Sequence, residues 1–468
     1  MTHLLPEKTT QHHESSMGQL ETALDQIGTT RSHRMIILMV VIGVMFDVFE
    51  QNAIGLIAPL LQMSWGLTAT DIGFLNTITF ISAAAGRLLS GYFADRLGRR
   101  FMLNVNLLLF TLGAILCALA PNYATLAIGR LIVGFGLGGE ITTAVTLLAE
   151  FCSSRFRGTA VGIINVGGGG LGNMLAPAFA LLVFYLFPGE NSWRWLFACL
   201  VLPALLLILY RRFIPETPRY LVSQGEIKQA NHVLSMLAAG KLLHQTFPVS
   251  QYIDEQPVRV QADNKRTDSW RMIFSSPYRK TTLSVGIASW MTFGAQLALL
   301  TLMPTILVSQ GYSINKSFLF TIIMQSGSLL GALTASSLAF YFPRKVILTC
   351  GSIAACASAI AFGSFTDSVA TILLTGALFQ FCVLLLNTTI WIYAPELFPT
   401  KMRGFGTSFI LAMGTIGGAL MQIPAGKVFD LLGTTGLFAM IAGMYIIFLI
   451  AIQFSSETFK RSIDRVVE

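Results

Sequence analysis

The sequence predicts an all-α membrane protein with twelve transmembrane helices, arranged as two pseudo-symmetric halves of six. Twelve apolar runs are each long enough to cross a bilayer, and the two halves of the chain repeat the same short motifs. Crossing about 30 Å of hydrocarbon takes roughly 20 apolar residues as helix, which satisfies every backbone polar group within one segment. The runs begin near Met35, Ile72, Phe101, Tyr123, Thr159, Trp193, Thr281, Ser317, Lys345, Ser368, Gly404 and Thr434.

The composition argues against a soluble enzyme or a nucleic-acid binder. Of 468 residues, 54% are hydrophobic and 12% are charged, whereas soluble chains carry about 25% charged residues. The net charge is +8, but Lys and Arg fall in short segments between apolar runs, as in cytoplasmic loops of membrane proteins. The six cysteines lack the spacing of a zinc or disulfide framework, so we expect no metal and no cofactor.

Polarity divides the chain into segments. The stretch between the sixth and seventh runs carries Glu226, Lys228, Asp254 and Arg259, and is too polar to span a membrane. Basic loops alternate from side to side, with Lys316 and Lys427 as exceptions, so both termini are expected in the cytoplasm. We expect a cytoplasmic tail over 1–34, a six-helix half over 35–213, a cytoplasmic linker over 214–280, a second half over 281–455 and a cytoplasmic tail over 456–468.

An internal repeat relates the two halves. Glu150 precedes Arg157-Gly158 after the fourth run with the same spacing as Glu396 precedes Arg403-Gly404 after the tenth. Pro215-Glu216-Thr217 after the sixth run likewise matches Ser456-Glu457-Thr458 after the twelfth. Duplicated six-helix halves are the plan of many secondary transporters.

The loop after the second run has the composition of a latch. Gly91-Tyr-Phe-Ala-Asp95-Arg96-Leu-Gly98-Arg99-Arg100 places a carboxylate at a helix end beside three guanidinium groups. Such a cluster can hold the cytoplasmic side closed and release it when the side opens. With the repeated Glu and Arg-Gly positions, the predicted cytoplasmic gate comprises Gly91, Asp95, Arg96, Gly98, Arg99, Arg100, Glu150, Arg157, Glu396 and Arg403.

This loop resembles the signature loop of the major facilitator superfamily, as does the run from Arg130 to Glu140 with its glycines. Pro215-Glu216-Thr217-Pro218-Arg219 and the stretch from Tyr393 to Gly404 resemble the branch of sugar porters and metabolite:proton symporters. The resemblance extends from about Ile36 to Thr458 and implies the major facilitator fold.

Two departures from the family pattern bear on function. The second copy of the signature loop retains only Arg344 and Lys345, so we expect a weaker latch there. The fifth run, glycine-rich from Gly167 to Gly172, lacks the Gly-Pro pair of proton antiporters, which favours symport. These glycines also suit close packing of membrane helices.

Five ionisable side chains lie inside apolar runs: Asp47, Glu50, Arg87, Arg130 and Glu140. Inserting one such side chain at the bilayer centre costs about 2.5 to 3.5 kcal/mol, so we expect each of them to have a functional or structural role. At about 1.5 Å of rise per residue, Asp47 reaches the depth of Arg130, and Arg87 that of Glu140. We hypothesise an outer pair, Asp47 with Arg130, and an inner pair, Glu140 with Arg87; fixing helix register is the alternative role.

All six histidines lie outside the predicted spans, so carboxylates must carry any coupled proton. We predict proton coupling by Asp47, Glu50, Arg130 and Glu140. The family resemblance associates the positions of Asp47 and Arg130 with this role. The run Phe46-Asp47-Val48-Phe49-Glu50 also resembles the paired-acid motif of aromatic-acid:proton symporters, with Glu50 where an aspartate is usual.

The predicted substrate-binding residues are polar or aromatic and lie inside spans. Arg87 can bind a substrate carboxylate bidentately or pair with Glu140 alone. Trp391 falls where the sugar-porter resemblance places a tryptophan that stacks on substrate. The full set is Arg87, Gln296, Gln325, Gln380, Asn387 and Trp391.

We therefore predict a proton symporter of a small organic, possibly aromatic, acid that works by alternating access. A sugar or polyol transporter is the first alternative, and a transporter-like nutrient sensor is the second. An enzyme is disfavoured because no nucleophile and base pair lies inside the spans. We expect a monomer in a bacterial inner membrane, with lipid, a small solute and protons as its partners.

Overall fold

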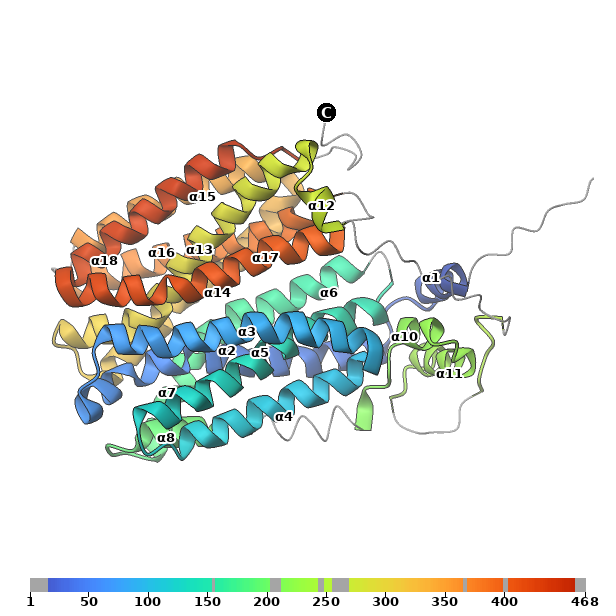
Figure 1. The fold of residues 1–468 in the computed structure, drawn as a ribbon, viewed down its shortest axis with the longest axis horizontal. Coiled ribbons are helices and arrows are strands. Elements are labelled where there is room, and N and C mark those ends of the chain that lie inside the picture. The colour runs from blue at the N-terminus through green and yellow to red at the C-terminus, as the bar shows by residue number, and fades with distance from the viewer. Residues whose placement is uncertain are drawn as a thin grey trace, which may run out of the picture.

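The computed structural model describes residues 16–153, 156–202, 212–242, 248–254, 269–364, 368–398 and 403–458. Within these ranges every regular element is a helix, and the long helices form two adjoining bundles (Figure 1). The first half of the chain builds one bundle and the second half builds the other. The predicted all-α fold of two halves is confirmed.

The first half contains the expected apolar runs as α2 to α8. The fifth run is split into α6, the π-helix η1 and α7. The sixth run begins with α8, and its residues 203–211 lie outside the described part of the chain. The bounds are α2 Arg31–Trp65, α3 Ala69–Leu97, α4 Arg99–Ala118, α5 Tyr123–Phe151, α6 Arg157–Ile164, η1 Asn165–Gly172, α7 Asn173–Leu186 and α8 Ser192–Cys199.

The second half repeats this order. Its eleventh run comprises α17 and the first part of α18, and Gly433, at φ 65°, separates it from the twelfth run in the rest of α18. The bounds are α13 Ser276–Ser309, α14 Ile314–Tyr341, α15 Arg344–Ser364, α16 Val369–Glu396, α17 Arg403–Leu420 and α18 Gln422–Gln453.

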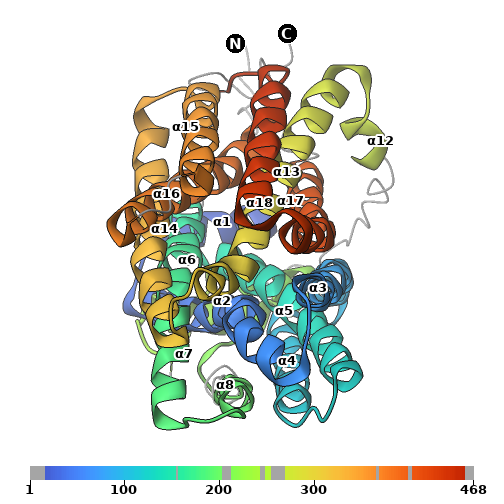
Figure 2. The ribbon, with the colours of Figure 1, turned by 90° about the vertical axis from the view of Figure 1, so that its left-hand side faces the viewer.

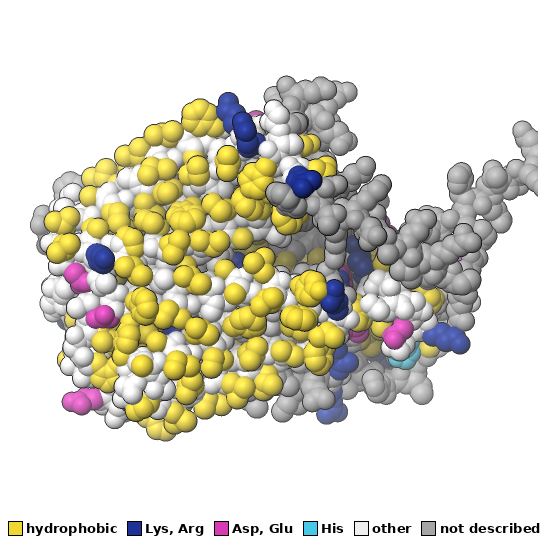
Figure 3. All heavy atoms as spheres, in the orientation of Figure 1, with side chains coloured by type: hydrophobic (Ala, Val, Ile, Leu, Met, Phe, Trp, Pro, Cys, Tyr) yellow, Lys and Arg dark blue, Asp and Glu magenta, His cyan; other side chains and the backbone are white. Residues whose placement is uncertain are grey.

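Length and hydropathy agree with membrane insertion. Ten segments of the described chain are long and apolar enough to cross a bilayer, and one of them, Phe405–Gln453, holds two of the expected runs. Hydrophobic side chains cover the flank of the molecule, whereas Lys and Arg gather toward one end (Figure 3). This agrees with the expected twelve spans, given that the sixth is only partly described.

Short helices gather at one end of the bundle, which we name the linker end; the opposite end is the loop end. They are α1 (Ser16–Ile27), α10 (Pro218–Ser223), α11 (Ile227–Ala238) and α12 (Ser269–Ile273), of which α1, α10 and α11 lie together (Figure 1). α1 belongs to the segment expected as a tail, yet it buries Leu20, Ala23 and Leu24. Glu21 forms an ion pair with Arg219 at 2.7 Å, so α1 is docked on the linker.

The two halves meet along α2, α3 and α7 of the first and α13, α14, α17 and α18 of the second (Figure 2). Near the loop end, Asp430 of α18 accepts hydrogen bonds from the backbone N–H groups of Ala69 and Thr70 at 3.2 and 3.0 Å. Thr77 Oγ1 donates to the Ala419 carbonyl at 2.8 Å. The loop end is the closed side of this conformation.

Candidate functional site

A cavity of about 130 Å³ lies between the two halves. Pockets for drug-sized ligands occupy roughly 300–1,000 Å³, so this cavity suits a small solute. Its walls come from α2, α3, α5, α6, η1 and α7 of the first half and α13, α16 and α17 of the second. The polar and aromatic side chains used below are Gln51, Arg87, Asn165, Asn173, Phe293, Gln296, Asn387, Trp391 and Thr415.

Arg87 brings a positive charge to this cavity. Its Nη1 donates to Thr415 Oγ1 at 2.7 Å, across the boundary between the halves. Its Nε finds no acceptor among the described residues. Because a guanidinium group has five N–H donors, Arg87 keeps donors that an incoming carboxylate could use.

Amide side chains line the facing walls. Asn387 Nδ2 donates to Gln296 Oε1, which joins α16 to α13. Asn165, at the start of η1, donates to Thr388 of α16 at 3.4 Å. Four of the six predicted substrate residues, Arg87, Gln296, Asn387 and Trp391, thus line one cavity.

Sequence reasoning missed Gln51, Asn165, Asn173 and Thr415, which also line the cavity. Asn173 accepts a hydrogen bond from Asn52 at 3.0 Å, which ties α7 to α2. Isolated amides and hydroxyls in apolar runs are common and serve as contacts between helices. The sequence therefore carried no signal that separated these four residues from amides and hydroxyls that only join helices.

Gln325 and Gln380 were predicted to bind substrate, and the structure places them elsewhere. Both are 2% exposed, and neither is among the residues that line the cavity. Ser328 Oγ donates to Gln325 Oε1 at 2.6 Å and lies 3.5 Å from Gln380 Oε1. Gln325 of α14 and Gln380 of α16 lie on helix faces that point into the second half. Through Ser328, their amides hold α14 against α16.

The predicted pairing of Asp47 with Arg130 is wrong. Arg130 Nη1 pairs instead with Glu50, one helical turn further along α2, and both side chains are fully buried. Arg130 Nε also donates to Thr79 Oγ1 at 3.1 Å, and the guanidinium lies 5.8 Å from the centre of the Phe197 ring. Neither Glu50 nor Arg130 lines the cavity.

The predicted pairing of Glu140 with Arg87 is also wrong. Among the described residues no ion pair joins Arg87 to Glu140; the Arg87 guanidinium donates to Thr415 instead, and Glu140 Oε2 finds no hydrogen-bond partner. The error arose from counting depth along straight helices. With 35 residues, α2 is about 52 Å long, so it projects beyond the bilayer and the point of membrane entry is poorly defined.

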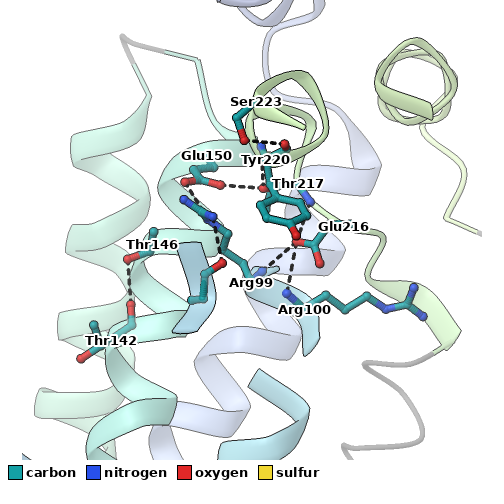
Figure 4. Close-up of polar contacts among 10 residues, drawn as sticks. Arg99, Arg100, Thr142, Thr146, Glu150, Glu216, Thr217, Tyr220 and Ser223 are labelled. Atoms are coloured by element: carbon teal, nitrogen blue, oxygen red, sulfur yellow. Dashed lines mark hydrogen bonds and ion pairs between the residues drawn. The ribbon is translucent and has the colours of Figure 1, made fainter. Parts of the chain in front are cut away.

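A charged cluster, named the first corner, closes the linker end of the first half (Figure 4). Arg99 Nε donates to Glu150 at 3.0 Å, and Thr217 Oγ1 donates to the other Glu150 oxygen at 2.6 Å. Glu216 accepts from the backbone N–H groups of Arg99 and Arg100 at 2.9 and 3.2 Å. Burial raises the pKa of the Glu216 carboxyl above its ordinary value, and these N–H donors oppose that rise.

The second half builds the same cluster, named the second corner. Arg344 donates to both carboxylate oxygens of Glu396 at 2.9 and 3.1 Å. Thr458 Oγ1 donates to Glu396 at 2.7 Å, and Glu457 accepts from the backbone N–H groups of Arg344 and Lys345 at 3.0 Å each. The sequence expectation of a weaker second latch is not supported by this geometry.

The remaining predicted gate residues are only partly described. Gly98 takes φ 100° at the start of α4, a conformation that favours glycine. Arg96 stacks on Tyr92 at 4.3 Å. Gly91 belongs to α3, with open space where a Cβ would stand among the described residues. The side chains of Asp95, Arg157 and Arg403 lie outside the described part of the structure.

No group of three or more His, Cys, Asp or Glu residues that could hold a metal ion occurs in the described part of the chain.

Known proteins share both the fold and the sequence features of this chain. The fold resembles the xylose transporter XylE from E. coli in a partially occluded inward-open conformation, with a TM-score of 0.74, 18% identity, and coverage of 92% of this chain and 99% of that one. The niacin transporter NiaP of Acinetobacter baylyi is 31% identical over 404 residues, which are 86% of this chain and 89% of the relative. A gallate transporter of Pseudomonas putida is 29% identical over 417 residues, which are 87% and 88% of the two chains.

The chain is embedded in the membrane, and its two bundles enclose a small cavity. This arrangement is that of a transporter with the major facilitator fold. The model of the family described as "Sugar (and other) transporter" matches residues 47–466, and the chain belongs to this family. The protein is therefore a transporter and not an enzyme.

Proposed function

We propose that the protein carries a small organic acid with a single ring across the membrane, together with protons. The observation that carries this proposal is Arg87, a cation in the wall of a small cavity between the halves. A buried guanidinium is costly unless it meets an anion. A carboxylate that enters the cavity would meet it with two charge-assisted hydrogen bonds.

The rest of the cavity suits a ring. Trp391 and Phe293 offer aromatic faces, and Asn165, Gln296 and Asn387 offer amides for polar substituents. The similarity to transporters of niacin and gallate, both aromatic acids, favours the same reading. We assign the predicted proton-coupling role to the group Asp47, Glu50, Arg130 and Glu140 as part of this proposal.

The proposed orientation places the linker end in the cytoplasm of a bacterial inner membrane. The basic residues Arg96, Arg99, Arg100 and Arg344 lie at this end, as the positive-inside rule expects. The relatives named above are bacterial. A single chain encloses the whole cavity, which supports transport by a monomer.

Uptake into proteoliposomes tests the proposal. With nicotinate, benzoate or shikimate supplied outside, we expect substrate-driven alkalinisation of the external medium, recorded with a pH dye. Arg87→Gln should weaken acid binding by about tenfold or more, since a hydrogen bond to a charged group contributes roughly 1.5 to 3 kcal/mol. Arg194→Gln is the matched control, because Arg194 is hydrogen-bonded at the loop end, away from the cavity.

Three results would contradict the proposal. Full affinity for the acid in Arg87→Gln would remove the binding role of Arg87. A proton signal with hexoses alone would favour the sugar alternative, which the family description also allows. Binding without any flux would favour a nutrient sensor.

A further inference from the structure

Arg87 and Thr415 form a hydrogen bond that joins the two halves at the level of the cavity. Arg87 Nη1 donates to Thr415 Oγ1 at 2.7 Å, and both residues line the cavity. The other hydrogen bonds between described residues of α3 and the second half lie nearer the loop end, at Ala69, Thr70, Asn76 and Thr77. The bond from Arg87 is therefore the one that can affect a substrate in the cavity.

The oxygen of Thr415 is an acceptor fixed by its own helix. A guanidinium group has five N–H donors and no acceptor, so Thr415 must accept from Arg87. The single hydroxyl hydrogen of Thr415 is directed at the Leu411 carbonyl, 3.1 Å away in α17. Thr415 is 4% exposed, so little water can compete for its oxygen. The position of this acceptor is thus set by α17.

The bond engages one corner of the guanidinium and leaves an edge with two donors. Nε and Nη2 lie on the same edge of the guanidinium plane, and Nη1 lies at the opposite corner. Nε of Arg87 finds no acceptor among the described residues. A carboxylate binds such an edge through two parallel N–H···O bonds, which requires a defined orientation of the plane. By holding Nη1, Thr415 restrains rotation of the guanidinium and sets this orientation.

Each partner of the bond is held in place by its own half. Gly86, next to Arg87, packs on α5, where an added Cβ would stand 3.0 Å from a backbone Cα. Gly417, two residues after Thr415, packs on α13, where an added Cβ would stand 2.7 Å from a backbone Cα. Such close approaches leave α3 and α17 little freedom to shift against these neighbours. The bond between Arg87 and Thr415 therefore requires the two halves to lie together at this level.

We propose that Thr415 is a positioning residue for the transported acid, which holds Arg87 from the opposite half and presents the Nε edge of the guanidinium to the carboxylate. This inference rests on the proposed function, because it requires that Arg87 binds the acid. The carboxylate site is then assembled from both halves, and Thr415 acts on the acid only through Arg87.

Two other roles of Thr415 lead to different results. If its hydroxyl only satisfied Arg87 in the empty cavity, removing the hydroxyl would free Nη1 for the carboxylate and strengthen acid binding. If it only packed α17 against α3, removing it would weaken binding whether or not Arg87 is present. The sign of the effect and its dependence on Arg87 therefore separate these roles from positioning.

The test is a double-mutant cycle on the binding of nicotinate and of benzoate to purified protein in detergent. Thr415→Val keeps the shape of the side chain and removes the acceptor, so it should weaken binding by about three- to tenfold, the effect of one intramolecular hydrogen bond. In an Arg87→Met background, which has no donor to position, Thr415→Val should change the affinity by less than about twofold. Thr415→Ser keeps the hydroxyl and should restore wild-type affinity.

Thr407→Val on the same helix is the matched control. The Thr407 hydroxyl finds no partner among the described residues, and Thr407 does not line the cavity, so this variant should bind the acids as the wild type does. Thr415→Ala gives the same comparison should Thr415→Val not fold.

Unchanged or tighter binding in Thr415→Val would overturn the inference. Equal losses in the wild-type and Arg87→Met backgrounds would also overturn it, as would a Thr415→Ser variant that binds no better than Thr415→Val. Absence of acid binding by the wild type, or full affinity in Arg87→Met alone, would instead refute the proposed function.

Discussion

Glu216 and Glu457 occupy equivalent positions and do the same work at the scale of single residues. Glu216 accepts from the first two backbone N–H groups of α4, and Glu457 does so for α15. The first N–H groups of a helix lack partners within it, and a carboxylate there also interacts favourably with the helix dipole. Each glutamate therefore caps a helix distant in sequence and holds the chain end of its own half in place.

Replacing either cap should lower the stability of the protein. We expect Glu216→Ala and Glu457→Ala each to cost about 0.5 to 2 kcal/mol, as for other helix caps. The thermal unfolding midpoint of purified protein in detergent measures this, with the exposed loop residue Glu190→Ala as control. Equal midpoints for all three variants and the wild type would show that the caps are dispensable.

At the scale of elements, the glycines of the motif from Arg130 to Glu140 are explained by contact between α3 and α5. A Cβ on Gly138 would stand 2.7 Å from the Cα of Ala83, in the backbone of α3. Only a residue without a side chain lets the two backbones approach this closely. This packing fixes α5 and hence the positions of Arg130 and Glu140.

Gly138→Ala should therefore force α3 and α5 apart. Overpacking of this kind costs about 1 to 3 kcal/mol, and here a backbone must shift. We expect a lower unfolding midpoint and weaker substrate binding than in Gly162→Ala, where the added methyl group meets open space among the described residues. Wild-type behaviour of Gly138→Ala in both assays would contradict the packing argument.

At the scale of the whole molecule, the closed loop end depends on contact between α3 and α18. A Cβ on Gly426 would stand 2.8 Å from the Cα of Thr70, and Asp430 caps the start of α3 from the opposite half. An alternating-access cycle must separate these helices to open the loop end. The seam therefore favours the conformation described here.

Gly426→Ala should prevent the seam from closing and shift the protein toward the state open at the loop end. Spin labels on Glu190→Cys and Lys316→Cys, in a background without native cysteines, should report longer distances between the halves. Gly443→Ala on the same helix is the control, since no described atom lies within 4 Å of its added Cβ. Identical distance distributions in the two variants would contradict this role of the seam.

Much of the architecture could be predicted from the sequence because its signals are local. Hydropathy over one run decides whether a helix can span a bilayer, and the repeated Glu and Arg-Gly spacings revealed the two halves. The rarity of charges in apolar runs also singled out Asp47, Glu50, Arg87, Arg130 and Glu140. The two predicted charge pairs, however, were both wrong.

Only the tertiary structure decided which of these residues meet. Asp47 and Glu50 are three residues apart, which is about 4.5 Å along a helix. The tilt of the helices and the part of α2 that extends beyond the bilayer introduce larger errors than this into a depth counted from the sequence. The rotation of a helix about its axis likewise decided that Gln296 and Asn387 face the cavity while Gln325 and Gln380 face the interior of one half. The sequence by itself determined which side chains needed partners, and the packing of the helices determined which residues those partners are.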